Sequence, residues 1–161
     1  MKIKTLTINA IVAALYVVVT LVVAPFGFTN IQFRLSEMFN HLIVFDKKYF
    51  FGIVVGVFIA NIFSPLGGYD LIFGVGQSVI SLGILILLNK FVADVKVRML
   101  LTTLVFSVTS VLVAWELALV LDYPFLYTWL TVAISEFIVL AVGAPIMYYI
   151  NKRIDFKKII N

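Results

Sequence analysis

The sequence contains no cysteine and only one histidine, His41. Disulfide bonds, thiolate chemistry and cysteine-ligated metals are therefore excluded, and a single histidine gives no basis for a histidine-ligated metal site. We accordingly expect neither a bound metal nor another cofactor. Charge is also scarce, because charged residues make up 12% of the chain, whereas a soluble domain carries about 25%. The composition therefore excludes a soluble globular domain.

Long hydrophobic runs take the place of the missing charge: 63% of the residues are hydrophobic, and the mean hydropathy is +1.16. Six segments are predicted as transmembrane helices, with approximate bounds 6–24, 32–45, 49–63, 71–89, 99–121 and 125–150. Because about 20 apolar residues are needed to cross the hydrocarbon, we expect the second and third segments to be tilted or shielded by their neighbours. Membrane β-strands are excluded, since the runs are long and do not alternate. The predicted fold is an all-α integral membrane protein in which residues 1–161 form a single domain, one compact bundle of six transmembrane helices.

Eleven of the twelve lysine and arginine residues fall into four clusters between the hydrophobic runs. The clusters are Lys2/Lys4, Lys47/Lys48, Lys90/Lys96/Arg98 and Lys152/Arg153/Lys157/Lys158. Six spans place all four clusters on one side of the membrane, and the positive-inside rule makes this side, with both termini, cytoplasmic. The predicted outer loops, 25–31, 64–70 and 122–125, contain no lysine or arginine. The net charge of +4 is thus explained by the basic loops on the cytoplasmic side of the lipid membrane, and it gives no reason to expect nucleic-acid binding.

Arg34 is the one cation outside the clusters, and most of the acidic residues share its half of the membrane. Three acidic residues accompany the basic clusters, whereas five are placed in the outer half: Glu37, Asp70, Glu116, Asp122 and Glu136. Charged groups inside a membrane are costly and indicate function. One arginine cannot neutralise several carboxylates, so a ligand that offers N–H donors or a positive charge would satisfy them. We therefore predict an outward-facing polar pocket, with Asp122 alone left to solvent.

Simpler interpretations of two of these residues stay open at this point. Arg34 and Glu37 lie one turn apart and could form only a structural ion pair. His41 lies one further turn along the same helical face, where we expect a satisfied, buried histidine rather than a ligand group.

Polar and small residues form one face of the segment 71–89 and its start, at Asp70, Gly74, Gln77, Ser78 and Ser81. Gln77 can both donate and accept hydrogen bonds, which suits the edge of a nucleobase, and Asn61 is comparable. An interhelical hydrogen bond is the alternative role for each. Trp115, beside Glu116, is a candidate for stacking on a planar ligand.

Small residues recur at every fourth position in two segments. They are Ala10 and Ala14 in the first segment, and Gly52, Gly56, Ala60 and Ser64 in the third. Small residues at this spacing let helices approach closely. We interpret the third-segment stripe as internal packing, and the first-segment stripe either as packing or as a surface that docks another membrane protein.

Several motifs resemble those of a known family. They are Ile31-Gln32-Phe33-Arg34-Leu35-Ser36-Glu37, then Ala60-Asn61-Ile62-Phe63-Ser64-Pro65-Leu66-Gly67-Gly68-Tyr69-Asp70 with Phe73-Gly74, and Ser135-Glu136-Phe137-Ile138-Val139-Leu140 with Gly143-Ala144-Pro145. In this order, and over nearly the whole chain, the sequence resembles the QueT family, the substrate-binding S components of energy-coupling factor (ECF) transporters for queuosine precursors.

The resemblance implies a six-helix S-component fold in the cytoplasmic membrane of a prokaryote, without an ATPase site of its own. It implies a 7-deazaguanine as the substrate, and an ECF module of one transmembrane scaffold subunit and two ATPases as the partner. Ala10 and Ala14 would face the coupling helices of the scaffold. Arg34, Glu37, Asn61 and Asp70 are motif residues that also belong to the predicted pocket.

Sequence and resemblance together predict a transport subunit rather than an enzyme, which captures a 7-deazaguanine from outside. The predicted substrate-binding residues are Arg34, Glu37, Asn61, Asp70, Gln77, Trp115, Glu116 and Glu136. A proton-coupled carrier that uses Glu116 or Glu136 as a relay is one alternative. An S component for another heterocycle, such as a pterin or flavin, is a second. A structural membrane protein without a ligand is a third, and it would leave the outer carboxylates unexplained.

Overall fold

The computed structural model describes residues 2–28 and 32–161, and in this part of the chain every regular element is a helix, with no strand. The elements are α1 (Ile3–Val22), α2 (Ala24–Gly27), η1 (Leu35–Val44), η2 (Lys47–Tyr49), α3 (Phe50–Ile62), α4 (Gly68–Leu88), α5 (Val95–Thr109), α6 (Val111–Leu121), α7 (Phe125–Ile154) and α8 (Phe156–Ile160). The predicted all-α class is confirmed. Part of the predicted outer loop 25–31, including Ile31 of the first motif, lies outside the described residues.

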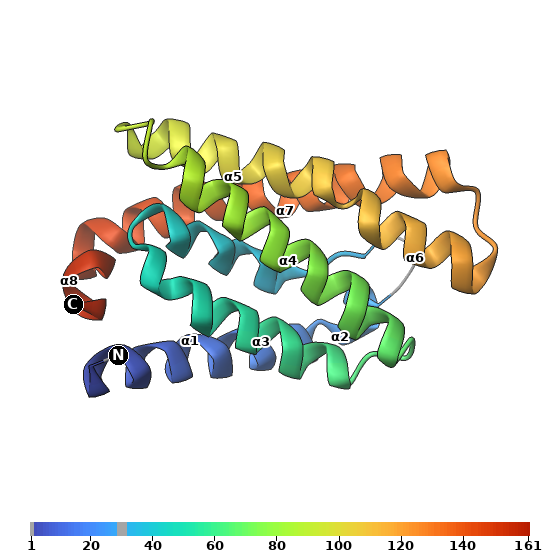
Figure 1. Ribbon diagram of the computed structural model, residues 1–161, viewed down its shortest axis with the longest axis horizontal. Coiled ribbons are helices and arrows are strands. Elements are labelled where there is room, and N and C mark those ends of the chain that lie inside the picture. Colours follow the sequence, from blue (N-terminus) through green and yellow to red (C-terminus); the bar gives the residue numbers. More distant parts are fainter. Residues whose placement is uncertain (1, 29–31) are drawn as a thin grey trace.

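The long helices run along one axis, with both ends of the chain at the same end of the bundle (Figure 1). Helix α1 packs along α3, α4 lies between α3 and α5, and α7 packs against α5 and α6. The 3₁₀ helix η1 lies inside this bundle and contacts α1, α4, α5 and α7. Seven of its ten residues are buried, so its neighbours shield it, as expected of a segment too short to face lipid by itself.

Within residues 2–28 and 32–161, four helical stretches are long and apolar enough to cross a membrane: Ile3–Val22, Gly68–Leu88, Val95–Leu121 and Phe125–Ile154. The other two predicted spans are shorter in the structure. Helix η1 has ten residues and α3 has thirteen, so each extends about 20 Å, against about 30 Å of hydrocarbon. The count of six spans therefore stays a prediction.

The predicted helix 99–121 is interrupted in the structure, because α5 ends at Thr109 and α6 begins at Val111. Hydroxyl groups near the break donate back to main-chain carbonyls: Thr109 to Val105, at 2.9 Å, and Ser110 to Ser107, at 2.7 Å. Such back-bonding competes with the helical ladder and bends helices. A continuous helix was expected here, and this run of hydroxyl side chains accounts for the difference.

Helices α1 and α3 approach closely at Gly56. A Cβ atom at this position would lie 2.8 Å from Cβ of Tyr16 and 3.2 Å from Cα of Ala13, so only glycine allows this contact. The third-segment stripe therefore packs internally, as interpreted from the sequence. Ala10 and Ala14 lie on the other side of α1 and are exposed.

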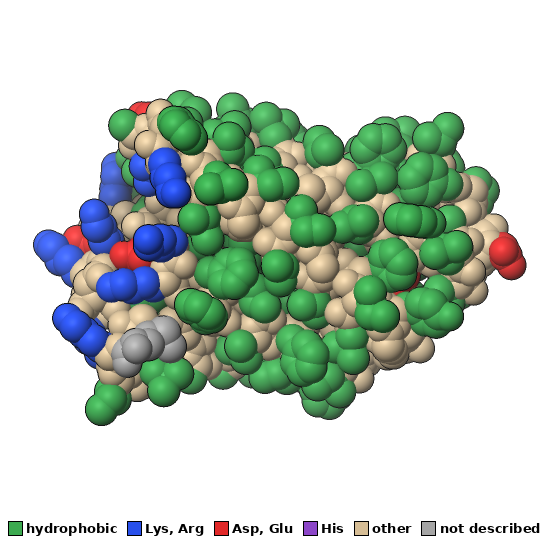
Figure 2. Space-filling model, in the orientation of Figure 1, with side chains coloured by type: hydrophobic (Ala, Val, Ile, Leu, Met, Phe, Trp, Pro, Cys, Tyr) green, Lys and Arg blue, Asp and Glu red, His purple; other side chains and the backbone are tan. Residues whose placement is uncertain are grey.

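Lysine and arginine side chains gather at the end of the bundle that carries both chain termini, and hydrophobic side chains cover the middle of the visible face (Figure 2). Arg98 connects three segments at this end. Its guanidinium donates to the carbonyl oxygens of Val92 at 2.6 Å, Asn89 at 2.8 Å and Val44 at 3.2 Å. These bonds tie the end of η1 to the connection between α4 and α5.

Candidate substrate-binding site

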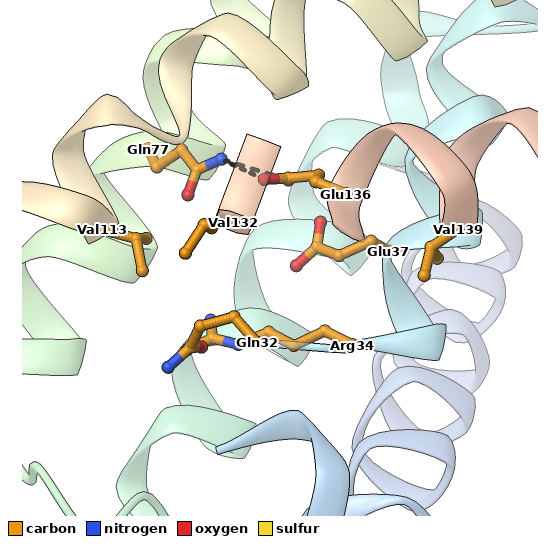
Figure 3. Close-up of a pocket in the computed structure, with 8 residues that line it drawn as sticks. All are labelled: Gln32, Arg34, Glu37, Gln77, Val113, Val132, Glu136 and Val139. Carbon is orange, nitrogen blue, oxygen red and sulfur yellow. Dashed lines mark hydrogen bonds between the residues drawn. The ribbon is translucent and has the colours of Figure 1, made fainter. Parts of the chain in front are cut away.

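A small cavity lies in the half of the bundle away from the basic end, where the chain entering η1 meets α4, α6 and α7. Its lining combines polar and charged side chains with three valines: Gln32, Arg34, Glu37, Gln77, Val113, Val132, Glu136 and Val139 (Figure 3). Four predicted site residues, from three separate elements, therefore meet here. The cavity measures about 10 Å³, which is room for about one water molecule.

Arg34 stands just before η1 and is 9% exposed. Its Nη2 pairs with Oδ1 of Asp70 at 3.1 Å, and its guanidinium carbon lies 5.5 Å from the ring centroid of Phe28. The ion pair with Glu37 that the sequence left open does not form, because the guanidinium reaches across to α4 instead. Arg34 is therefore partly neutralised before any ligand enters.

Asp70 is held by more than this ion pair. The hydroxyl of Ser64 donates to its other carboxylate oxygen, and Nδ2 of Asn61 donates to its main-chain carbonyl at 3.0 Å. A Cβ atom at position 74 would lie 2.6 Å from Nδ2 of Asn61, so Gly74 makes room for that amide. The motif residues Asn61 and Asp70 thus do not line the cavity. Asp70 holds the Arg34 guanidinium in place, and Asn61 holds Asp70.

Glu37 is oriented by two donors. The hydroxyl of Tyr16, from α1, lies 2.6 Å from Oε1, and Nδ2 of Asn40 donates to Oε2. Residues three apart eclipse one another in a 3₁₀ helix, which places Asn40 directly below Glu37. The sequence interpretation assumed an α-helix and placed His41 there, which is wrong. Nε2 of His41 instead contacts the carbonyl oxygen of Leu140 at 2.9 Å. The histidine is buried, as expected, but only this ring nitrogen is satisfied, because Nδ1 has no partner among the described residues.

Glu136 of α7 faces Gln77 of α4. The amide Nε2 of Gln77 lies 3.1 Å from both carboxylate oxygens of Glu136 and 3.3 Å from the carbonyl oxygen of Phe106 (Figure 3). Within the described residues, neither Glu136 nor Glu37 has a lysine or arginine at ion-pair distance. Two carboxylates therefore line one small cavity while the nearby guanidinium pairs with a third.

Two polar atoms at the cavity have no hydrogen-bond partner among the described residues. They are Oε1 of Gln32 and Nε of Arg34, and both are buried. Gln32 also has a φ of 53°, a left-handed conformation that is unfavourable for a residue with a side chain. A strained residue with an unpaired acceptor at a cavity is typical of a binding site.

Glu116 and Trp115 do not line the cavity. Glu116 is fully buried and its carboxylate lies beside that of Asp70, and in the part of the chain that the structure describes no group donates a hydrogen bond to either of its oxygens. Trp115 points the other way, because it is 53% exposed and packs edge-on against Phe73, with ring centroids 6.0 Å apart. The structure thus separates these neighbours from the four predicted residues that it brings together.

Sequence reasoning missed Tyr16 and Gln32 as site residues. Tyr16 carried a signal, because the hydroxyl of a tyrosine inside an apolar helix requires a hydrogen-bond partner. Gln32 stood in the first motif, two positions before Arg34, but its backbone conformation leaves no trace in a single sequence. No group of three or more histidine and acidic residues that could hold a metal occurs in the part of the chain that the structure describes.

Comparisons with known proteins agree with one another. The QueT transporter family matches residues 6–152 of this chain. The chain is 36% identical to the queuosine precursor transporter QueT of Lactococcus lactis subsp. cremoris (strain MG1363), and the alignment covers 92% of this chain and 93% of that relative. No solved structure matches.

Proposed function

Because this chain belongs to the QueT transporter family, we propose that it captures a queuosine precursor, a 7-deazaguanine, as the substrate-binding subunit of an ATP-driven ECF importer. The relative is named as a transporter of queuosine precursors, and the apolar helices suit a membrane protein. The chain is accordingly a transporter component and not an enzyme. ATP hydrolysis would belong to two partner ATPases joined through a scaffold subunit.

The proposed topology has six spans, with both termini and the basic end in the cytoplasm. The gathering of lysine and arginine at the end that carries the termini supports this orientation (Figure 2). Helices η1 and α3 would be the two short spans, with η1 shielded by the helices that pack around it. The cavity would then lie in the outer half, where a substrate arrives.

The acid excess at the cavity is the observation that carries the proposed ligand class. Glu37 and Glu136 have no cation at ion-pair distance in the described chain, and Arg34 is already paired with Asp70. An anionic ligand would meet repulsion from these carboxylates, whereas a ligand with several N–H donors would satisfy them. A 7-deazaguanine offers N1–H, a 2-amino group and, in aminomethyl derivatives, a cation.

We assign the base edge to Glu136. Both oxygens of Glu37 already accept hydrogen bonds, from Tyr16 and Asn40, so Glu37 suits a positive or donor substituent without reorienting. Both oxygens of Glu136 share the single amide nitrogen of Gln77, and this amide stands where the N1–H and 2-amino donors would bind. When the ligand displaces the Gln77 amide from Glu136, this amide would donate a hydrogen bond to O6 of the 7-deazaguanine. The three valines would contact the faces of the planar ring.

Binding in this cavity requires the lining to separate. The present volume of about 10 Å³ holds about one water molecule, whereas a bicyclic base is several times larger. We therefore place an opening step before or during capture, and the unpaired atoms of Gln32 and Arg34 are the groups that gain partners when a ligand enters.

Calorimetric titration of the purified protein tests the ligand class. The panel contains 7-deazaguanines with neutral and aminomethyl substituents, guanine, and B vitamins including a flavin and a pterin. We expect the deazaguanines to bind more tightly than every other compound. Tighter binding of a vitamin would overturn the proposed substrate. The protein would then be an S component for a different heterocycle.

Glu116 favours one alternative, a proton-coupled carrier that works without ATPases. It is fully buried, beside Asp70, and both of its oxygens lack a donor, which is the environment of a proton relay. Uptake into vesicles that contain only this chain decides between the two. Uptake driven by a proton gradient would establish the carrier, whereas uptake that requires ATP and the partner subunits would establish the importer.

A further inference from the structure

A second hollow lies at the basic end of the bundle, on the outer surface between α5 and α7. It measures about 400 Å³ and is lined by Lys96, Met99, Leu100, Thr103, Phe137, Ala141, Ala144, Pro145, Tyr148 and Tyr149. It shares no residue with the cavity described above. Helices α5 and α7 lie side by side here, on the opposite side of the bundle from α1 (Figure 1).

The groove exists because α7 presents small residues where it meets α5. Ala141, Ala144 and Pro145 leave space over the buried side chains of Met99 and Thr103. Larger apolar side chains form the sides, and the groove follows the helices. Its shape therefore suits an extended apolar chain that lies parallel to the bundle, which is how acyl chains lie beside a membrane helix.

The end of the groove carries positive charge without a matching carboxylate. The Nζ atoms of Lys96 and Lys152 lie 5.9 and 4.8 Å from the ring centroid of the same tyrosine, Tyr148. In the described part of the chain the ion pairs are Arg34–Asp70 and Lys158–Asp155, so neither Lys96, which lines the groove, nor Lys152, which lies beside it at Tyr148, has one. Two ammonium groups held at one ring repel each other, and an anion beside them would offset this cost.

We propose that the groove binds an anionic phospholipid, with one acyl chain between α5 and α7 and the headgroup phosphate at Lys96 and Lys152. Basic pockets between membrane helices on the cytoplasmic side are typical sites for such headgroups. The tyrosines place aromatic rings at the level of the headgroup, where such rings are favoured. This site leaves the exposed face of α1 free and does not depend on the identity of the transported substrate.

Native mass spectrometry of the detergent-solubilised full chain tests the site. Phosphatidylglycerol and phosphatidylcholine with identical chains compete for retention, and inorganic phosphate is added as a separate competitor. Each lysine near the membrane surface contributes about 1 kcal/mol to the binding of an anionic lipid, and affinity changes about tenfold per 1.4 kcal/mol. The two lysines should therefore give a preference of about 30-fold for the anionic lipid. The K96Q/K152Q double variant should lose this preference. The K47Q/K90Q variant removes the same charge from the same end, outside the groove, and should keep it.

A second variant tests the acyl-chain part separately. Ala141→Phe fills the hollow from an exposed position and should reduce retention of both lipids while it leaves the melting temperature unchanged. The proposal is overturned if the unaltered protein shows no preference for the anionic lipid, if both double variants lose it equally, or if inorganic phosphate displaces the lipid. It is also overturned if K96Q/K152Q keeps the lipid preference but loses a co-purifying membrane protein, since the groove would then be a protein-docking surface.

Discussion

The two ends of the bundle satisfy their charges in different ways. At the basic end the lysines are mostly exposed to solvent, and Arg98 donates to three main-chain carbonyls. At the other end Arg34 and four carboxylates are buried: Glu37, Asp70, Glu116 and Glu136. Only one of these carboxylates, that of Asp70, forms an ion pair with Arg34. Solvent and main-chain carbonyls therefore satisfy most charges at the basic end, whereas three of the four buried carboxylates at the other end have no cation at ion-pair distance among the described residues.

This difference separates a structural role from a recognition role. A cation that binds carbonyls at helix ends stabilises the connections between helices. Buried carboxylates without a cation cost free energy of folding, and their presence is accounted for if a ligand supplies the missing donors. Variants at matched positions of the two ends test this distinction, beginning with the largest expected effect.

Arg34→Ala should lower the free energy of unfolding by about 3–5 kcal/mol, because it removes one partner of a buried ion pair and leaves Asp70 without its cation. It should weaken ligand binding as well. Thermal unfolding of the detergent-solubilised protein, with and without ligand, measures both effects. The second-site change Asp70→Asn should restore part of the lost stability. An unchanged melting temperature together with lost binding would show that Arg34 is a direct ligand contact and not an organiser.

Glu136→Gln should weaken ligand binding by about 1–3 kcal/mol, the effect of losing charge-assisted hydrogen bonds. Glu116→Gln is the matched control, since it makes the same change at a buried carboxylate that does not line the cavity. It should leave affinity within about 0.5 kcal/mol of the unaltered protein. Titration calorimetry compares the two. A larger loss from Glu116→Gln would place the ligand nearer Asp70 and restore the role that the sequence predicted for Glu116.

Arg98→Ala should lower the free energy of unfolding by about 1–2 kcal/mol, the scale for a small number of net hydrogen bonds. The effect is smaller than for Arg34 because Arg98 is only half-buried, and water can reach the carbonyls that it leaves. Ligand affinity should not change. A loss of affinity equal to that of Arg34→Ala, measured in the same titration, would show that the two ends are coupled.

Much of the fold followed from hydropathy and charge position, whereas the site followed only in part. The shared depth of Arg34 and the acidic residues predicted a pocket that contains Arg34, Glu37 and Glu136, and the polar face of the segment 71–89 added Gln77; all four line the cavity. The Asn40 partner of Glu37 was not predictable, because it depends on the 3₁₀ geometry of η1. This geometry places Asn40 and not His41 below Glu37, and local sequence does not distinguish the two helix types within a buried segment.

The contribution of Tyr16 illustrates a second limit. Its side chain packs against Gly56 of α3, and its hydroxyl reaches Glu37 of η1. The glycine stripe predicted the close approach, but it did not identify the partner helix. Glu116 and Trp115 are adjacent in sequence, yet one is buried and the other faces outward. Depth along the membrane can be predicted from sequence, whereas rotation about a helix axis inside a uniformly apolar segment cannot.

The smallest expected effect on the isolated protein comes from the exposed face of α1. Ala10→Trp and Ala14→Trp should each change stability and ligand affinity by less than about 0.5 kcal/mol, because both alanines are exposed. Since lipid provides no hydrophobic drive between helices, docking depends on close backbone approach, and a bulky side chain should reduce co-purification with the ECF module.

Ala13→Trp is the matched control, because Ala13 is buried next to Gly56, and overpacking there should cost about 1–3 kcal/mol of stability. Pull-down and titration of all three variants in parallel separate the two faces. Normal complex formation by Ala10→Trp and Ala14→Trp would contradict a docking role for this face and leave the scaffold to bind elsewhere on the bundle.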